Sequence, residues 1–87
     1  MGNEMDKYDR QRLNQVYETQ PSGQSAAWVN PDTGNQYTVT PEPAFTNPST
    51  DQVCRDAVIN AVIAGREQQV HTTACRGPDG QWHVEDQ

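Results

Sequence analysis

The chain has 87 residues, of which 32 % are hydrophobic, and its formal net charge is −6. This length allows one small domain, and only one Leu and one Phe are available for its core. The acidic balance excludes tight binding to nucleic-acid phosphates and disfavours attraction to an anionic membrane surface. A core this limited would gain much from a covalent cross-link, and the chain contains two cysteines.

Membrane-spanning and targeting segments are not predicted. The best apolar run, residues 57–64, is far shorter than the roughly 20 residues that a spanning helix needs. Residues 1–4 lack the basic head and apolar segment of a signal peptide. We therefore expect a cytoplasmic chain or one trimmed of a leader.

An N-terminal helix is predicted over Glu4–Thr19. The residues near helical spacing are Met5, Tyr8, Leu13, Val16 and Tyr17. Pro21 disfavours helix at the residue before it, so the helix should end there. Because the apolar stripe is weak, we expect residues 1–20 to form a helix that is loosely packed against a β domain of residues 21–87.

The rest of the chain has the composition of short β-strands separated by turns. The expected strands are residues 25–29, 36–40 and 81–85, with residues 44–46 as an edge strand. Pro, Asp, Gly and Asn in residues 30–35 and 77–80 favour turns.

Residues 51–65 fit two structures. As a helix, the segment would have a stripe of Val53, Ala57, Ala61 and Ala64. As a strand, it is rich in the β-branched residues that strands favour, although its alanines weaken this assignment. The strand is the preferred prediction.

A hairpin register supports the strand and pairs the cysteines. If Ala64 and Gly65 form a two-residue turn, the numbers of opposite residues sum to 129, and Cys54 and Cys75 satisfy this sum. They would then occupy a non-hydrogen-bonded pair, where Cα atoms lie closest and within disulfide range. We predict a disulfide between Cys54 and Cys75; two free buried thiols are the alternative.

An ordered set of motifs resembles a known family. The motifs are Trp28–Asn35, Tyr37–Pro41, Cys54-Arg55, Gly65-Arg66, Ala74–Arg76 and Pro78–Trp82. Together they resemble the C-terminal domain of the bacterial surface-antigen lipoproteins, typified by the rickettsial common surface antigen. The resemblance implies a location in the outer membrane or periplasm and an antiparallel sheet with a helix. It also implies an N-terminal lipid anchor, absent from this chain, as the only membrane attachment.

Candidate sites are few. A nucleophile made of Cys75 with His71 or His83, and a metal site at the two histidines, are both disfavoured because the chain is short for a catalytic cleft. The candidate interaction surface consists of Trp28, Trp82, Arg55 and Arg76. The favoured interpretation of these residues places the tryptophans in the core, because the chain has one Leu and one Phe, and the arginines in solvent near carboxylates. No catalytic residue, metal ligand or cofactor is predicted.

We therefore expect an α+β fold, with an N-terminal helix and an antiparallel sheet of four or five strands. The expected function is that of a non-enzymatic, monomeric envelope domain that acts structurally or by protein interaction, with envelope proteins or cell-wall components as candidate partners and no nucleic acid. The alternative is a periplasmic or secreted inhibitor of a basic enzyme such as a cell-wall hydrolase, because the charge of −6 would attract such a partner.

Overall fold

A computed structural model describes residues 5–85 as one helix and six strands. The elements are α1 (Lys7–Thr19), β1 (Ala26–Val29), β2 (Gln36–Pro41), β3 (Phe45–Thr46), β4 (Val53–Ile63), β5 (Arg66–Arg76) and β6 (Trp82–Val84). The helix begins at Lys7 rather than at Glu4, which lies outside the described residues, because Asp6 caps its N-terminus. The predicted fold class is confirmed, with the two-residue β3 raising the number of strands to six.

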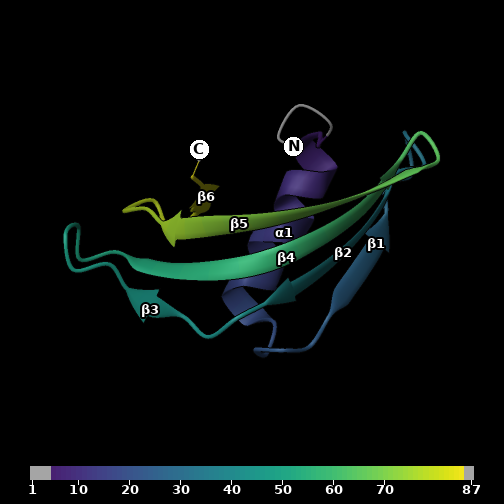
Figure 1. The fold of residues 1–87 in the computed structure, drawn as a ribbon. Coiled ribbons are helices and arrows are strands. Elements are labelled where there is room, and N and C mark those ends of the chain that lie inside the picture. Colours follow the sequence, from purple (N-terminus) through teal and green to yellow (C-terminus); the bar gives the residue numbers. More distant parts are fainter. Residues whose placement is uncertain (1–4, 86–87) are drawn as a thin grey trace.

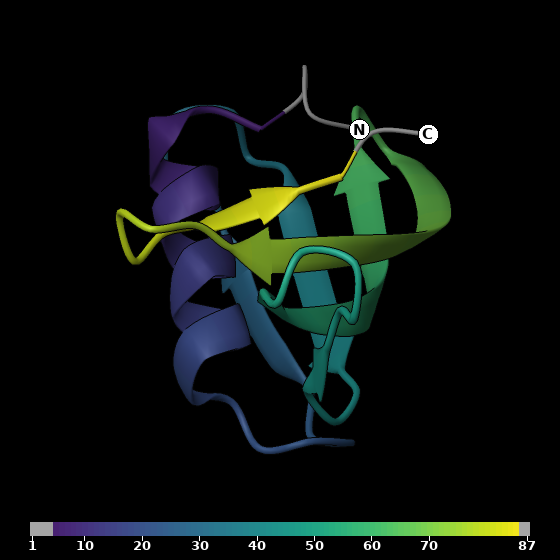
Figure 2. The same ribbon diagram turned by 90° about the vertical axis from the view of Figure 1, so that its left-hand side faces the viewer.

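The strands form one antiparallel sheet with α1 across one face (Figures 1 and 2). The strand order is β1-β2-β4-β5-β6, and β3 pairs with β4 on the same side as β2. Strands β4 and β5 are the longest, so their hairpin forms the centre of the sheet. The face opposite α1 is not covered by a helix (Figure 2).

The β4–β5 hairpin has the predicted register. Ala64 and Gly65 form its two-residue turn with φ values of 52° and 77°, the left-handed conformation that such turns require. The ladder runs from Ile63 opposite Arg66 to Cys54 opposite Cys75. The strand prediction for residues 51–65 is confirmed, and the helical alternative is wrong.

Helix and sheet share one hydrophobic core. Alternate residues of β4, Ala57, Ile59 and Ala61, face α1 and are buried beneath it. The helix contributes Leu13, Val16 and Tyr17 to the same core. This contact is closer than the weak apolar stripe of the helix suggests, since polar side chains also fasten it to the sheet.

Tyr17 makes one of these polar contacts. Its side chain is 1 % exposed, stacks on Trp82 with ring centroids 5.5 Å apart, and its hydroxyl lies 2.8 Å from Thr72 Oγ1. Burial raises the pKa of the Tyr17 hydroxyl, so the neutral form that hydrogen-bonds to Thr72 is favoured.

The substitution Tyr17→Phe should lower the free energy of unfolding by about 1 kcal/mol, because it removes this hydrogen bond and keeps the ring. Urea unfolding measures the change, and Tyr8→Phe serves as the matched control because Tyr8 is exposed. Equal losses in the two variants would show that the bond to Thr72 contributes nothing.

Candidate functional site

The cysteines of the β4–β5 hairpin form a disulfide. The Cα atoms of Cys54 and Cys75 are 4.0 Å apart, and both residues are buried. The predicted pairing is confirmed, and the alternative of free thiols is wrong, because the described part of the chain has no free cysteine. Glu85 Oε1 lies 3.0 Å from Cys75 Sγ. A disulfide sulfur carries no proton and is not a thiolate, so these three residues provide neither a nucleophile nor a thiolate ligand for a metal.

Neither histidine has a free thiol beside it in the described part of the chain, because both cysteines are in the disulfide. His71 is exposed opposite Val58, and His83 lies on β6 opposite the disulfide-bonded Cys75. Nε2 of His83 is 3.3 Å from Asp79 Oδ2, and both side chains are more than half exposed. The Gln81 backbone N–H, together with His83, holds the pKa of Asp79 below its ordinary value. The contact between His83 and Asp79 is therefore a solvent-exposed interaction at the turn that precedes β6.

Three of the four residues of the candidate interaction surface are buried. Trp28 and Trp82 are each 6 % exposed and Arg55 is 7 % exposed, so three of its four residues lie inside the protein. The core interpretation of the tryptophans is confirmed: Trp28 packs on Tyr37, with ring centroids 5.4 Å apart. The sequence favours this interpretation, because a chain with one Leu and one Phe needs its tryptophans for the core.

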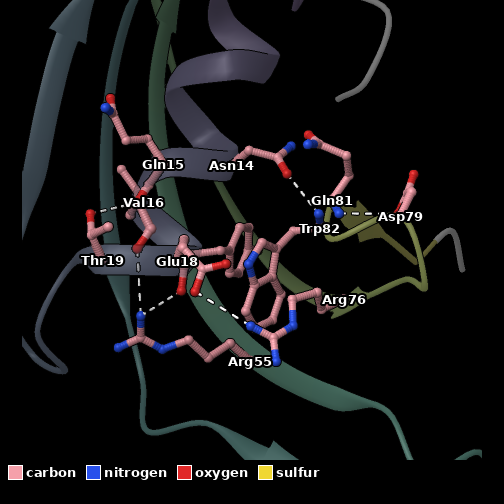
Figure 3. A network of polar contacts seen from close by, with 11 residues as sticks. Asn14, Gln15, Val16, Glu18, Thr19, Arg55, Arg76, Asp79, Gln81 and Trp82 are labelled. Atoms are coloured by element: carbon pink, nitrogen blue, oxygen red, sulfur yellow. Dashed lines mark hydrogen bonds and ion pairs between the residues drawn. The ribbon is translucent and has the colours of Figure 1, made fainter.

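Arg76, the fourth residue, is exposed. Its Nη1 lies 3.5 Å from Glu18 Oε2, with 42 % and 49 % of the two side chains exposed (Figure 3). An exposed ion pair of this kind contributes little to stability. The interpretation of Arg76 as a solvated arginine beside a carboxylate is confirmed, whereas the same interpretation of Arg55 is wrong.

Arg55 fastens the end of α1 to the sheet. Its Nη1 donates to the Tyr17 carbonyl at 2.9 Å and, at 3.5 Å, to that of Val16 (Figure 3). Its Nε donates to the Glu42 carbonyl at 2.7 Å, and its Nη2 to Ser22 Oγ at 3.1 Å. The cation thus meets the negative end of the helix dipole and the Tyr17 carbonyl, one of the last-turn carbonyls of a helix that need a partner from outside it; the Val16 carbonyl also accepts from the Gln20 N–H.

A buried polar cluster fastens the start of α1. Asp9 is 0 % exposed; its Oδ1 accepts a hydrogen bond from Trp28 Nε1 at 2.9 Å and its Oδ2 accepts one from Asn30 Nδ2 at 3.0 Å. Asn30 Nδ2 also donates to Asp6 Oδ1 at 2.8 Å. Asp6 and Asp9 form a reciprocal capping box. Sequence reasoning missed this cluster, although two aspartates three residues apart at a helix start are the signal for such a cap.

Stability should fall in acid through Asp6. Hydrogen bonds from the Asn30 side chain and the Asp9 backbone N–H hold the pKa of Asp6 below its ordinary value of 3.8. The unfolded chain therefore binds a proton before the folded one does. The stabilisation is present above pH 3.8 and is lost as the pH falls through the lowered folded-state pKa.

Urea midpoints measured between about pH 2 and pH 5 test this titration. The variant Asp6→Asn keeps a capping side chain and should give a shallower acid slope than the natural protein. Parallel slopes would exclude Asp6 as the titrating group.

A groove lies between α1 and the β5–β6 end of the sheet. Its volume is about 480 Å³, and its apolar lining includes Leu13, Ile59, Val70 and Val84. Polar groups at its rim include Arg10 and Glu85. Val84 is 41 % exposed, so part of this apolar surface faces solvent. The groove was not predicted, because it depends on how far β6 extends along β5.

The family model of the 17 kDa outer membrane surface antigen matches residues 15–83. The chain belongs to this family. The resemblance drawn from its motifs is thereby confirmed, and the matched segment contains the disulfide and Arg55. Asp6 and Asp9 precede the segment that the model matches.

Curated relatives extend the match to almost the whole chain. The 17 kDa surface antigen of Rickettsia bellii is 44 % identical over 88 residues, which is 97 % of this chain and 55 % of the relative. The antigens of Rickettsia conorii and Rickettsia prowazekii are 44 % and 41 % identical, covering 92 % and 91 % of this chain and 52 % of each relative. The chain thus spans about half the length of these surface antigens.

No solved structure matches the chain significantly. Within residues 5–85, no helix is long and apolar enough to cross a bilayer. Because no solved structure matches, membership of the surface-antigen family rests on the similarity of sequences.

Proposed function

We propose that this chain is the soluble, periplasm- or surface-exposed domain of an outer-membrane lipoprotein and that it acts structurally or through protein interaction, without catalysis. The observation that carries the proposal is its membership of the 17 kDa outer membrane surface antigen family. Relatives 41–44 % identical to it are named surface antigens. The alternative of an enzyme inhibitor receives no support from these relatives.

The disulfide supports a location outside the cytoplasm. Disulfides persist in oxidising compartments such as the periplasm and cell surface, whereas cytosolic thiols are kept reduced. Cys54 and Cys75 are paired across the central hairpin, where the cross-link holds the longest strands together. An envelope location allows this cross-link to form.

The cysteines and the buried charged side chains are committed to the fold, which supports a non-enzymatic role. The cysteines are cross-linked, and the Asp9 carboxylate accepts hydrogen bonds from Trp28 and Asn30. Arg55 donates to main-chain carbonyls and to Ser22. A catalytic acid, base or nucleophile must instead be free to reach a substrate.

Cell fractionation tests the proposal. The full-length protein, produced in its own organism or in a Gram-negative host, should appear in the outer-membrane fraction and incorporate labelled palmitate. Protease added to intact cells then distinguishes surface exposure from periplasmic exposure. Recovery of the protein in the cytosol without label would overturn the proposal.

A further inference from the structure

Strand β5 has a long edge that no other described strand covers. Strand β6 pairs only with residues 74–76, and the Glu85 N–H donates to the Thr73 carbonyl. Within residues 5–85, nothing pairs with residues 66–72 on the side away from β4. This stretch of β5 therefore resembles the open template to which an additional strand can bind.

The register shows which backbone groups are free. Ile63 and Arg66 flank the two-residue turn and form a hydrogen-bonded pair, and bonded and non-bonded pairs alternate from there. Even-numbered residues of this stretch therefore point their N–H and C=O groups toward β4. Glu67, Gln69 and His71 point theirs outward, so three donors and three acceptors along the edge have no strand partner among residues 5–85.

The apolar groove adjoins this edge. Val70 and Thr72 line it from β5, and Ile59 from β4. These three residues share the face of the sheet that carries α1. Because side chains alternate between the faces of a strand, those residues of an added strand that lie beside Val70 and Thr72 and face α1 would enter the groove.

We propose that the free edge of β5 binds an extended peptide segment of another protein as an added strand, with apolar side chains in the groove and basic side chains between them. This inference deepens the proposed protein interaction, on which it rests, by naming the surface and the partner. Main-chain hydrogen bonds would supply affinity and the groove would supply specificity, as in other strand-addition complexes.

Charge favours a basic segment. The edge carries Arg66 beside Glu67 and the groove is lined by Arg10 as well as Glu85, so the local charges balance, and the attraction comes from the net charge of −6 of the whole chain. Beyond the charged residues Arg66 and Glu67 next to the turn, the edge lacks the charged residues and prolines that commonly protect exposed strands from pairing. A basic segment would therefore be attracted to the protein and meet no obstacle along residues 67–71.

A second copy of this chain fits less well. If two β5 strands paired, the side chains offered to each groove would include Arg66 and Gln68, which are polar and match an apolar lining poorly. Each copy would also bring a charge of −6. Both observations favour a different protein as the partner.

The probe is an acetylated, amidated heptapeptide that alternates lysine and valine. In a titration followed by 15N–1H NMR, we expect saturable shifts at the amides of Glu67, Gln69 and His71, and their slower hydrogen exchange. The control peptide has the same composition with its lysines and valines in separate blocks. Equal binding of both peptides would indicate general charge attraction and overturn the proposal.

The variant Gln69→Pro removes one outward N–H and leaves the ladder to β4 intact, because that N–H takes no part in it. We expect at least about a tenfold rise in Kd for the alternating peptide, equivalent to about 1.4 kcal/mol. The variant Gln69→Ala keeps the N–H and should bind nearly as well as the natural chain. Unchanged binding by Gln69→Pro would contradict strand addition.

A second measurement protects the test against a misfolded variant. Alternate amide nitrogens of the bound peptide point toward β5 and away from it. Methylating one alternate set would block the hydrogen bonds to β5 and abolish binding, whereas methylating the other set would not, and the protein is unchanged in both cases. Binding unaffected by either pattern would overturn the proposal. So would sedimentation that shows a dimer of this chain which the Gln69→Pro substitution dissociates, because a second copy would then occupy β5. Cell fractionation is independent of these results, so failure here would leave the proposed envelope location standing.

Discussion

Replacing Arg55 with methionine should lower the free energy of unfolding by about 3–5 kcal/mol, one of the two largest losses expected for this protein. Arg55 is 7 % exposed and donates to the carbonyls of Tyr17 and Glu42 and to Ser22 Oγ. Methionine fills much of the same volume but donates nothing. The Tyr17 carbonyl at the end of α1 would lose its Arg55 partner, and the helix would be held to β4 by the hydrophobic core without this set of polar contacts.

Urea or thermal unfolding of Arg55→Met measures this loss. The matched control is Arg76→Met, which removes an exposed ion pair with Glu18 and should change stability by less than about 1 kcal/mol. Arg55→Lys retains the charge without the planar set of donors and should be intermediate. Equal effects of the Arg55→Met and Arg76→Met substitutions would show that the buried contacts do not fasten the helix.

Removing the disulfide is the second large change. The double variant Cys54→Ala/Cys75→Ala should lose about 3 kcal/mol, because the unfolded chain regains the freedom of the loop between residues 54 and 75. For a domain of this size, that corresponds to a fall in Tm of about 12–24 °C.

Calorimetry on the oxidised protein, the reduced protein and the double variant separates the cross-link from the side chains. The reduced protein and the double variant should melt close together, and the oxidised protein well above both. If reduction leaves the Tm unchanged, the cross-link contributes no stability and the proposed dependence of this small core on it is wrong.

The hairpin and its disulfide could be predicted because they depend on local rules. The two-residue turn at Ala64-Gly65 determines every pair in the ladder, so the meeting of Cys54 and Cys75 follows from counting. Strands β1, β2 and β6 could also be predicted, because the Pro- and Gly-containing turns at residues 30–35 and 77–80 are local signals as well. The choice of strand over helix for residues 51–65 also followed from residue type.

The fastening of α1 could not be predicted in the same way, because its partners lie far apart in sequence. Asp9 meets Trp28 and Asn30, and Arg55 reaches back to Tyr17. Estimating helix packing from apolar residues alone overlooks these contacts. One signal was available: Arg55 shares a strand face with Ala57 and Ile59, and a charged residue on the core face of a strand needs buried partners.

The candidate site was harder to predict than the fold. The predicted surface joined Trp28, Trp82, Arg55 and Arg76 by residue type, and three of these are buried. The free edge of β5 arises from a difference in strand length, since β6 has three residues and β5 has eleven. Residue type gives no information about an unpaired edge, which becomes visible only when all strands are placed.

We infer that this chain is a disulfide-locked domain of the cell envelope. The most direct measurement is the redox state of Cys54 and Cys75 in living cells: acid quenching, alkylation with a large maleimide and detection by gel shift. We expect no gel shift without prior reduction and a shift of two maleimides after reduction. Two modified thiols without reduction would contradict it.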